Sequence, residues 1–196
     1  MAMNLLTPIN DMAYCTSIIG PMFAGKTTAN IKIKRDCEKA NIRVLGFKPR
    51  CDIRYGIESV FHSHDNDTEK CEVIDDINEV LIHPEYKETK VIILDQGHFY
   101  GPSILTVVEQ MIIDKKYIVV SGLSGSYKQR SIGYIGDIIA LSDTVHLMRA
   151  TCEYCEEVTD APFTIKFQGG NSDIQVGSKE SYKPVCRKHF CKYEET

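Results

Sequence analysis

Hydrophobic positions in this chain gather in short continuous runs, and longer mixed stretches of helix-forming residues separate them. Runs of aliphatic and β-branched residues without a polar alternation are typical of strands buried on both faces of a parallel sheet. They predict strands at 14–19, 43–47, 72–74, 91–94, 117–122 and 144–148. Stretches without proline or glycine predict helices at 28–39, 76–81 and 103–115. The pattern predicts an α/β fold in which helices flank a parallel sheet.

The last fifty residues have a different character from the rest. They hold four of the eight cysteines, together with several glycines and turn-forming residues. A chain of 196 residues can bury roughly 70% of its unfolded surface, which is enough for one good core. No apolar run approaches the ~20 residues of a membrane span. We therefore predict an α/β domain over residues 1–147 and a small metal-tied C-terminal domain over residues 148–196.

The segment after the first predicted strand has the spacing of a phosphate-binding loop, G-x-x-x-x-G-K-[ST]. It reads Gly20, Pro21, Met22, Phe23, Ala24, Gly25, Lys26 and Thr27, and Thr28 continues it. The glycines let backbone N–H groups point at phosphate oxygens, and Lys26 adds positive charge near the β and γ phosphates. Thr27 would offer its hydroxyl to Mg²⁺. The loop predicts that the chain binds ATP with Mg²⁺.

The predicted strand at 91–94 is followed directly by Asp95. A carboxylate at the carboxyl end of a buried parallel strand is the second part of a phosphate-loop site, because it holds Mg²⁺ opposite the loop hydroxyl. The sequence therefore predicts that Thr27 and Asp95 share the metal ion.

Cysteine spacing near the C-terminus predicts a structural Zn²⁺ site. The pairs Cys152-x-x-Cys155 and Cys186-x-x-His189 supply three sulfur ligands and one nitrogen, which closes a tetrahedral site against water. Cys191 is the rival for the fourth position, and its longer spacing from Cys186 places His189 ahead of it. The remaining cysteines are scattered, and we interpret them as small core or half-exposed residues.

Together these motifs resemble the type II thymidine kinases, the zinc-containing deoxynucleoside kinases of vertebrate cytosol, many bacteria and large DNA viruses. The resemblance rests on the phosphate loop, on the stretch from Asp95 to Tyr100 and on the two ligand pairs, and it runs from about Tyr14 to about Phe190. It implies transfer of phosphate from ATP to the 5′-hydroxyl of thymidine, giving dTMP for nucleotide salvage and DNA synthesis. It further implies a homotetramer, feedback inhibition by thymidine triphosphate, and a cytoplasmic location, which is the host cytoplasm for a viral protein.

The chain departs from this family at Gln96. The family motif is similar to Asp-Glu-Gly-Gln-Phe-Phe, and its Glu is taken as the general base for the sugar hydroxyl. An amide can orient a hydroxyl but cannot take its proton. Three explanations stay open: an engineered replacement, a native residue in a relative with little turnover, or another group as base. His98 is the substitute by residue type, although a pocket-wall histidine with a hydrogen-bond partner is the ordinary interpretation.

Nucleoside contacts are implied by the resemblance alone. In similar kinases, the segment between the zinc-ligand pairs folds as a lasso over the thymine base, and the matching positions here are Thr164 and Tyr182. The further positions implied for the nucleoside pocket are Met22, Asp52, Phe99, Leu123 and Tyr127. Arg54 matches a residue near the transferring phosphate, where it would stabilise transition-state charge.

Two other classes of function are considered beside a kinase. One is a catalytically inactive relative that binds nucleosides or nucleotides, which Gln96 favours. The other is a zinc-containing ATPase that moves on nucleic acid. Such motors need an acidic residue beside the metal-binding Asp and a basic surface. The chain has no acidic residue beside Asp95, and its net charge of −4 and lack of a basic stripe argue against a basic surface. We therefore expect no nucleic-acid partner, and we also expect no membrane partner.

Overall fold

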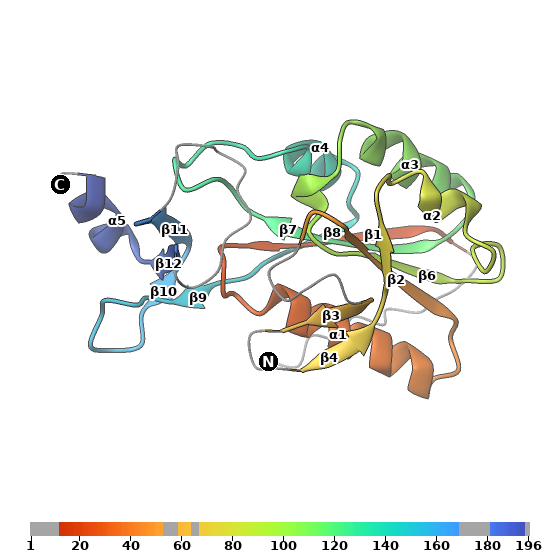
Figure 1. Ribbon diagram of the computed structural model, residues 1–196, viewed down its shortest axis with the longest axis horizontal. Helices are drawn as coiled ribbons and strands as arrows, with labels where there is room; N and C mark the ends of the chain where they lie inside the picture. Colours follow the sequence, from red (N-terminus) through yellow and green to blue (C-terminus); the bar gives the residue numbers. More distant parts are fainter. Residues whose placement is uncertain (1–11, 53–58, 64–66, 169–180, 195–196) are drawn as a thin grey trace.

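The computed structural model describes residues 12–52, 59–63, 67–168 and 181–194 (Figure 1). Its centre is a six-stranded parallel sheet with the strand order β5-β2-β6-β7-β1-β8. The strands are β1 (Tyr14–Gly20), β2 (Val44–Pro49), β5 (Glu72–Ile74), β6 (Val91–Leu94), β7 (Tyr117–Leu123) and β8 (Thr144–Leu147). All six predicted strands form, and the predicted parallel α/β sheet is confirmed.

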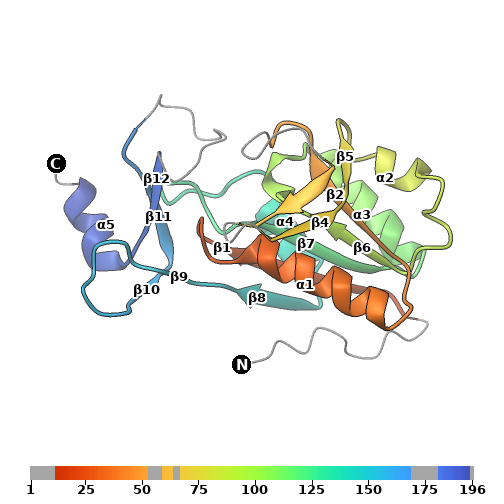
Figure 2. The same ribbon diagram turned by 60° about the horizontal axis from the view of Figure 1, so that its bottom comes forward.

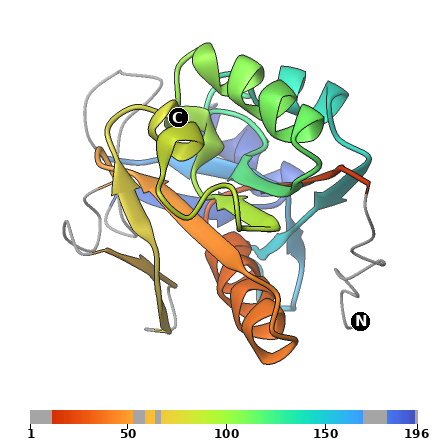
Figure 3. The same ribbon diagram turned by 90° about the vertical axis from the view of Figure 1, so that its right-hand side faces the viewer.

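Helices cover both faces of the sheet, as the end-on view in Figure 3 shows. One face carries α2 (Glu79–Ile82), α3 (Ser103–Ile113) and α4 (Ile135–Ala140); the other carries α1 (Lys26–Lys39) and a hairpin of β3 (Val60–His62) and β4 (Thr68–Lys70). In β6, Ile92 and Leu94 enter the cluster under α2 and α3, while Val91 and Ile93 enter the cluster under α1. Burial on both sides explains why these strands are apolar throughout.

The helix predictions differ from the structure at their ends. The helix predicted at 76–81 begins only at Glu79, because Asp76 accepts a hydrogen bond from the Asn78 N–H and Glu79 accepts one from the Asp76 N–H. These contacts stabilise a turn in place of a first helical turn. The helix predicted at 103–115 ends at Ile113, and Lys115 follows with a φ of 55°. The short helix α4 was not predicted, since six residues with an internal glycine give no clear period.

The C-terminal part lies beyond the carboxyl ends of the sheet strands (Figures 1 and 2). It contains β9 (Ala150–Thr151), β10 (Asp160–Ala161), β11 (Phe163–Lys166), β12 (Tyr182–Val185) and α5 (Arg187–Glu194). β9 pairs with β10 and β11 pairs with β12, both antiparallel. Its small apolar cluster includes Phe190 and Ile165 and extends to Ala24 of the predicted phosphate loop. The predicted boundary between residues 147 and 148 stays a prediction.

Among the residues that the structure describes, no helix combines the length and the apolar character that spanning a membrane requires.

Candidate functional site

The turn from β1 into α1 has the backbone of an anion-binding loop. Gly25, the N-cap of α1, has a φ of 77°, and Phe23 has a φ of 64°, which a side chain rarely adopts. No side chain caps this 14-residue helix and its first turn holds no acidic residue. Its N-terminal N–H groups and the positive end of its dipole therefore favour a phosphate. Lys26, only 7% exposed, donates to the Pro21 carbonyl oxygen at 2.5 Å.

Asp95 lies at the end of β6 and is buried against three donors. Its Oδ2 accepts from the Thr27 hydroxyl at 3.2 Å, and its Oδ1 accepts from Asn30 Nδ2 at 3.1 Å and from Ser121 Oγ at 2.5 Å. A buried carboxylate keeps its charge only when such donors compensate for lost water. The structure thus brings together Thr27 and Asp95, as predicted from sequence. Asn30 and Ser121 were missed.

Asn30 could have been found from the sequence, because it follows Thr27 by three residues and so shares its helix face. Ser121 gave no such signal, because only the sheet order brings β7 beside β6.

These residues fit a magnesium ion. The Thr27 hydroxyl and the Asp95 carboxylate converge as hard oxygen ligands, the kind that Mg²⁺ prefers. Next to them, Asn30 Oδ1 is buried without a hydrogen-bond partner in the described part of the chain. An acceptor left unpaired beside a carboxylate suits the water shell that Mg²⁺ keeps in proteins.

Gln96 and His98 occupy the turn after Asp95, which contains the short 3₁₀ helix η1 (Gly97–Phe99). Gln96 is 5% exposed, has a φ of 55°, and its side chain makes no hydrogen bond to any described residue. His98 is also buried, and its Nδ1 accepts from the Leu123 N–H at 3.3 Å. That bond occupies the Nδ1 lone pair and holds the ring against β7. This geometry fits the ordinary interpretation of His98, a pocket-wall histidine with a hydrogen-bond partner.

Several residues assigned to the nucleoside pocket are brought together at the phosphate loop. The Met22 N–H donates to Thr164 Oγ1 at 3.0 Å, which joins the β11–β12 hairpin to the loop. The ammonium of Lys166 lies 5.2 Å from the ring centre of Tyr127 and 5.8 Å from that of Tyr182. Lys166, which sequence reasoning missed, thus links the two predicted tyrosines.

The other predicted residues lie at the end of β7, in α1 and in the segments that follow β6 and β2. Leu123 ends β7 in register with Gly20, and Thr28 lies in the first turn of α1. Phe99 lines a cavity of about 280 Å³ together with Cys51, the neighbour of Asp52. Arg54, like most of the segment between β11 and β12, lies outside the described residues.

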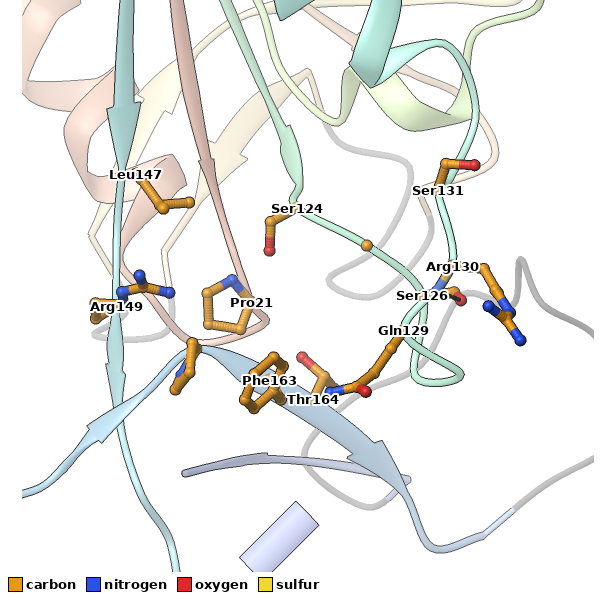
Figure 4. A pocket seen from close by; sticks show the side chains of 12 residues that line it. Pro21, Ser124, Ser126, Gln129, Arg130, Ser131, Leu147, Arg149, Phe163 and Thr164 are labelled. Carbon is orange, nitrogen blue, oxygen red and sulfur yellow. Dashed lines mark hydrogen bonds between the residues drawn. The ribbon is translucent and has the colours of Figure 1, made fainter. Parts of the chain in front are cut away.

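A larger cavity of about 430 Å³ opens beside the phosphate loop (Figure 4). Pro21 and Thr164 line it together with the loop after β7 and the chain after β8. Figure 4 shows Arg149 and Arg130 at opposite sides, with Phe163 at the base. Its volume is that of a small-molecule site, and both the sheet and the C-terminal hairpin form its walls.

The four predicted zinc ligands form one cluster. The ligand atoms of Cys152, Cys155, Cys186 and His189 all lie within 4.8 Å of one another. His189 Nδ1 is 3.3–3.5 Å from the three sulfurs, and Cys155 Sγ is 3.8 Å from Cys186 Sγ. Tetrahedral Zn²⁺ with ordinary bond lengths separates two sulfurs by about 3.8 Å and a sulfur from a nitrogen by about 3.5 Å. The cluster could therefore hold zinc, whereas Cys191 is exposed and not part of it.

The surroundings of Cys152 favour the thiolate that a metal needs. Burial raises the pKa of this thiol. Backbone hydrogen bonds at Cys186 and Tyr154 and the contact with His189 outweigh that effect and lower the pKa to about 6. A thiol with such a pKa loses its proton near neutral pH, and metal binding needs the deprotonated form.

Comparison with known proteins agrees with this geometry. The family described as thymidine kinase matches residues 13–190. The thymidine kinase of Myxoma virus (strain Lausanne) is 34% identical over 177 residues, covering 88% of this chain and 93% of the viral protein. That of Onion yellows phytoplasma (strain OY-M) is 29% identical over 180 residues, covering 89% and 85%. Among solved structures, AMPPCP-bound DnaA from Aquifex aeolicus has a TM-score of 0.44 and 12% identity over 71% of this chain and 42% of that chain, too low to carry an argument.

Proposed function

The chain belongs to the thymidine kinase family, and we propose that it transfers the γ-phosphate of ATP to the 5′-hydroxyl of thymidine, giving dTMP. The observation that carries this proposal is the contact between Thr27 and the buried Asp95 beneath the uncapped start of α1. It joins a phosphate site to a metal site, as ATP-dependent phosphoryl transfer requires.

Phosphate binding falls to the phosphate loop. Its backbone N–H groups and Lys26 hold the triphosphate, and the same charges stabilise the negative charge that spreads over the transferring group. Thr27 and Asp95 would hold Mg²⁺, which would neutralise negative charge on the triphosphate. Asn30 and Ser121 keep the Asp95 carboxylate oriented towards that position.

The acceptor nucleoside binds between the sheet end and the C-terminal hairpin in this proposal. Thr164 fixes the hairpin to the loop residue Met22, so the base and the phosphates are held at a defined distance. Leu123 and Phe99 provide apolar walls, and Tyr127 and Tyr182 lie beside the base. Asp52 and Arg54 act near the sugar and the transferring phosphate.

Gln96 sets the expected rate. In a loose transition state the proton of the attacking hydroxyl leaves late, so positioning alone supports some transfer without a base. General base catalysis is typically worth ~10²–10⁴-fold. We therefore propose a kinase with intact binding and strongly reduced turnover. The second candidate, a catalytically inactive nucleoside-binding relative, is favoured by the same residue.

Zinc, assembly and regulation complete the proposal. A Zn²⁺ ion on the Cys₃His cluster has a structural role, because protein ligands fill all its positions. The protein assembles as a homotetramer in the cytoplasm, the host cytoplasm if its source is a virus. Thymidine triphosphate inhibits it by occupying the nucleoside pocket while its phosphates reach the phosphate loop.

The experiment combines turnover with ligand binding. We expect slow formation of dTMP from thymidine, ATP and Mg²⁺, abolished by Lys26→Ala. Thymidine triphosphate should raise the melting temperature well above the value with ATP, because it engages the hairpin and the phosphate loop together. Equal stabilisation by both nucleotides contradicts the regulatory part. If the protein binds thymidine but does not phosphorylate it, the second candidate function, a catalytically inactive nucleoside-binding protein, is supported in place of the kinase.

A further inference from the structure

The carboxylate of Asp95 lies on the face of the sheet that α1 covers. Ile93, two residues earlier, packs in the apolar cluster under α1, and side chains two apart along a strand share a face. On the neighbouring strand β7, Ser121 follows Val119 of the same cluster by two residues. The alternation of both strands therefore turns Asp95 and Ser121 towards α1, where Asn30 is completely buried.

The two oxygens of the Asp95 carboxylate have different surroundings. Oδ2 accepts from the Thr27 hydroxyl at 3.2 Å, on the side of the phosphate loop. Oδ1 accepts from Ser121 Oγ at 2.5 Å and from Asn30 Nδ2 at 3.1 Å, and the same Nδ2 donates to Ser121 Oγ at 2.8 Å. A carboxylate oxygen has two lone pairs, so these two donors occupy Oδ1. Oδ2 is left as the oxygen that faces the loop.

The Asn30 side chain is costly at its position in α1. Its Oδ1 is buried and has no hydrogen-bond partner in the described part of the chain. An aliphatic side chain, like those of Ile31 and Ile33 in the same helix, would fill the space without leaving an oxygen unpaired. The favourable part of the amide is therefore Nδ2, which together with the Ser121 hydroxyl holds one oxygen of Asp95.

We propose that Asn30 and Ser121 leave Asp95 with one oxygen available to a metal ion and thereby select Mg²⁺ over Ca²⁺ at the phosphate loop. This inference rests on the metal site of the proposed function. Mg²⁺ needs near-ideal octahedral geometry and binds few protein ligands, whereas Ca²⁺ takes about six to eight oxygens and often uses both oxygens of a carboxylate. With Oδ1 occupied, Thr27 and Asp95 suit the smaller ion and deny the larger ion a ligand. Asn30 and Ser121 are positioning residues, because they act on the metal through Asp95.

The first measurement compares the two metal ions in variants that free Oδ1. The Ca²⁺ and Mg²⁺ concentrations that give half-maximal thermal stabilisation, with ATP present, are determined for the parent, Ser121→Ala and Asn30→Ala. The ratio of the Ca²⁺ value to the Mg²⁺ value should fall about 5–10-fold in each variant, because Oδ1 can then turn towards the larger ion. An unchanged ratio in both variants overturns the proposal. Equal weakening for both metals also overturns it, because the two residues would then only hold Asp95 in place.

The control removes a different buried serine hydroxyl from the sheet. Ser17 lies in β1, is as buried as Ser121, and its hydroxyl is hydrogen-bonded to Ser142 Oγ at 2.6 Å. Ser17→Ala should therefore leave the ratio of the two metal concentrations within twofold of the parent. If the ratio falls as far in Ser17→Ala as in Ser121→Ala, the contact with Asp95 is not the cause and the proposal is overturned.

Formation of dTMP, measured separately with thymidine, ATP and Mg²⁺, distinguishes this inference from the proposed function. If the chain never phosphorylates thymidine but its variants show the shifted metal ratio, the proposed function is contradicted and the inference stands. If the chain forms dTMP and the ratio is unchanged in both variants, the inference alone is overturned.

Discussion

The parallel sheet and the C-terminal hairpin region differ in what holds them together. Counted over the described residues, the sheet lies between two apolar clusters of sixteen and ten buried residues, enough to order the strands without any ligand. In the described part of the C-terminal region the cluster has eight buried residues, and two of them are the zinc-ligand candidates Cys152 and Cys186. A core of that size leaves little to offset the entropy of ordering four short strands and a helix. We therefore propose that the hairpin region needs a bound metal ion to stay folded, whereas the sheet does not.

The same division applies to the chemistry of the site. The proposed phosphate and magnesium positions are at the carboxyl ends of β1 and β6, where small displacements would be costly for phosphoryl transfer. The proposed nucleoside positions Thr164 and Tyr182 are on the C-terminal hairpin. The hydrogen bond from Met22 to Thr164 connects the two regions.

The largest expected effect is on zinc, and it separates the two regions most sharply. Cys155→Ser should release about one Zn²⁺ per chain and unfold the hairpin region while the sheet stays folded. Binding of a structural zinc is typically worth about 10–16 kcal/mol, and that energy orders the region. Zinc analysis together with amide hydrogen exchange, read separately for β6–β7 and for β9–α5, measures both effects.

Cys191→Ser is the control for the zinc experiment, because this exposed cysteine lies outside the cluster. It should keep both the metal and the exchange protection. Carefully prepared protein without zinc, or equal loss in both variants, would contradict the comparison of the two regions.

Gln96→Glu tests the chemistry of the sheet alone. It should raise kcat for thymidine phosphorylation by roughly 10²-fold or more, because a carboxylate can accept the proton of the sugar hydroxyl. Thymidine affinity should change little, since the two side chains have nearly the same shape. Steady-state kinetics measure kcat and KM for thymidine in this variant. The control is Gln110→Glu, which introduces the same change at an exposed position on α3. A parent chain that already turns over at ~1–100 s⁻¹ would show that the base is another group or water.

Sequence predicted the sheet better than the hairpin region, and the reason is physical. Strands buried on both faces are continuous apolar runs, and the phosphate loop and the zinc ligands have fixed spacings, so local sequence identifies them. Strands of two to four residues such as β9 and β12 are too short to show a period. Ser121 and Lys166 acquire their roles only from partners distant in sequence, which no local pattern contains. The role of Arg54 stays a prediction.

Thr164→Val tests the connection between the two regions. The valine removes the acceptor of the buried Met22 N–H and leaves that donor unpaired, which costs about 1–3 kcal/mol. The KM for thymidine should rise about 10-fold, while zinc content stays unchanged. Thr164→Ser keeps the hydroxyl and should restore most of the affinity. If the serine and valine variants behave alike, the lost packing of the methyl group explains the effect and the hydrogen bond does not.

The smallest effect concerns the attachment of the β3–β4 hairpin to α1, and it should leave the C-terminal region untouched. Partial burial raises the pKa of Glu69, but hydrogen bonds from Arg35 and Lys34 outweigh it and lower the pKa below the ordinary value. A carboxyl group with a lowered pKa stabilises the fold above its unfolded pKa of about 4.3, and the contribution is lost as pH falls through the folded pKa. Glu69→Gln should therefore destabilise the protein by about 0.5 kcal/mol at pH 7 and by nothing once the parent carboxyl is protonated. Urea unfolding of the parent and the variant, from pH 7 down to the pH at which Glu69 is protonated, measures the difference in free energy of unfolding. The control is Glu88→Gln at an exposed position. If the variant remains less stable than the parent in acid, the effect comes from packing and not from charge.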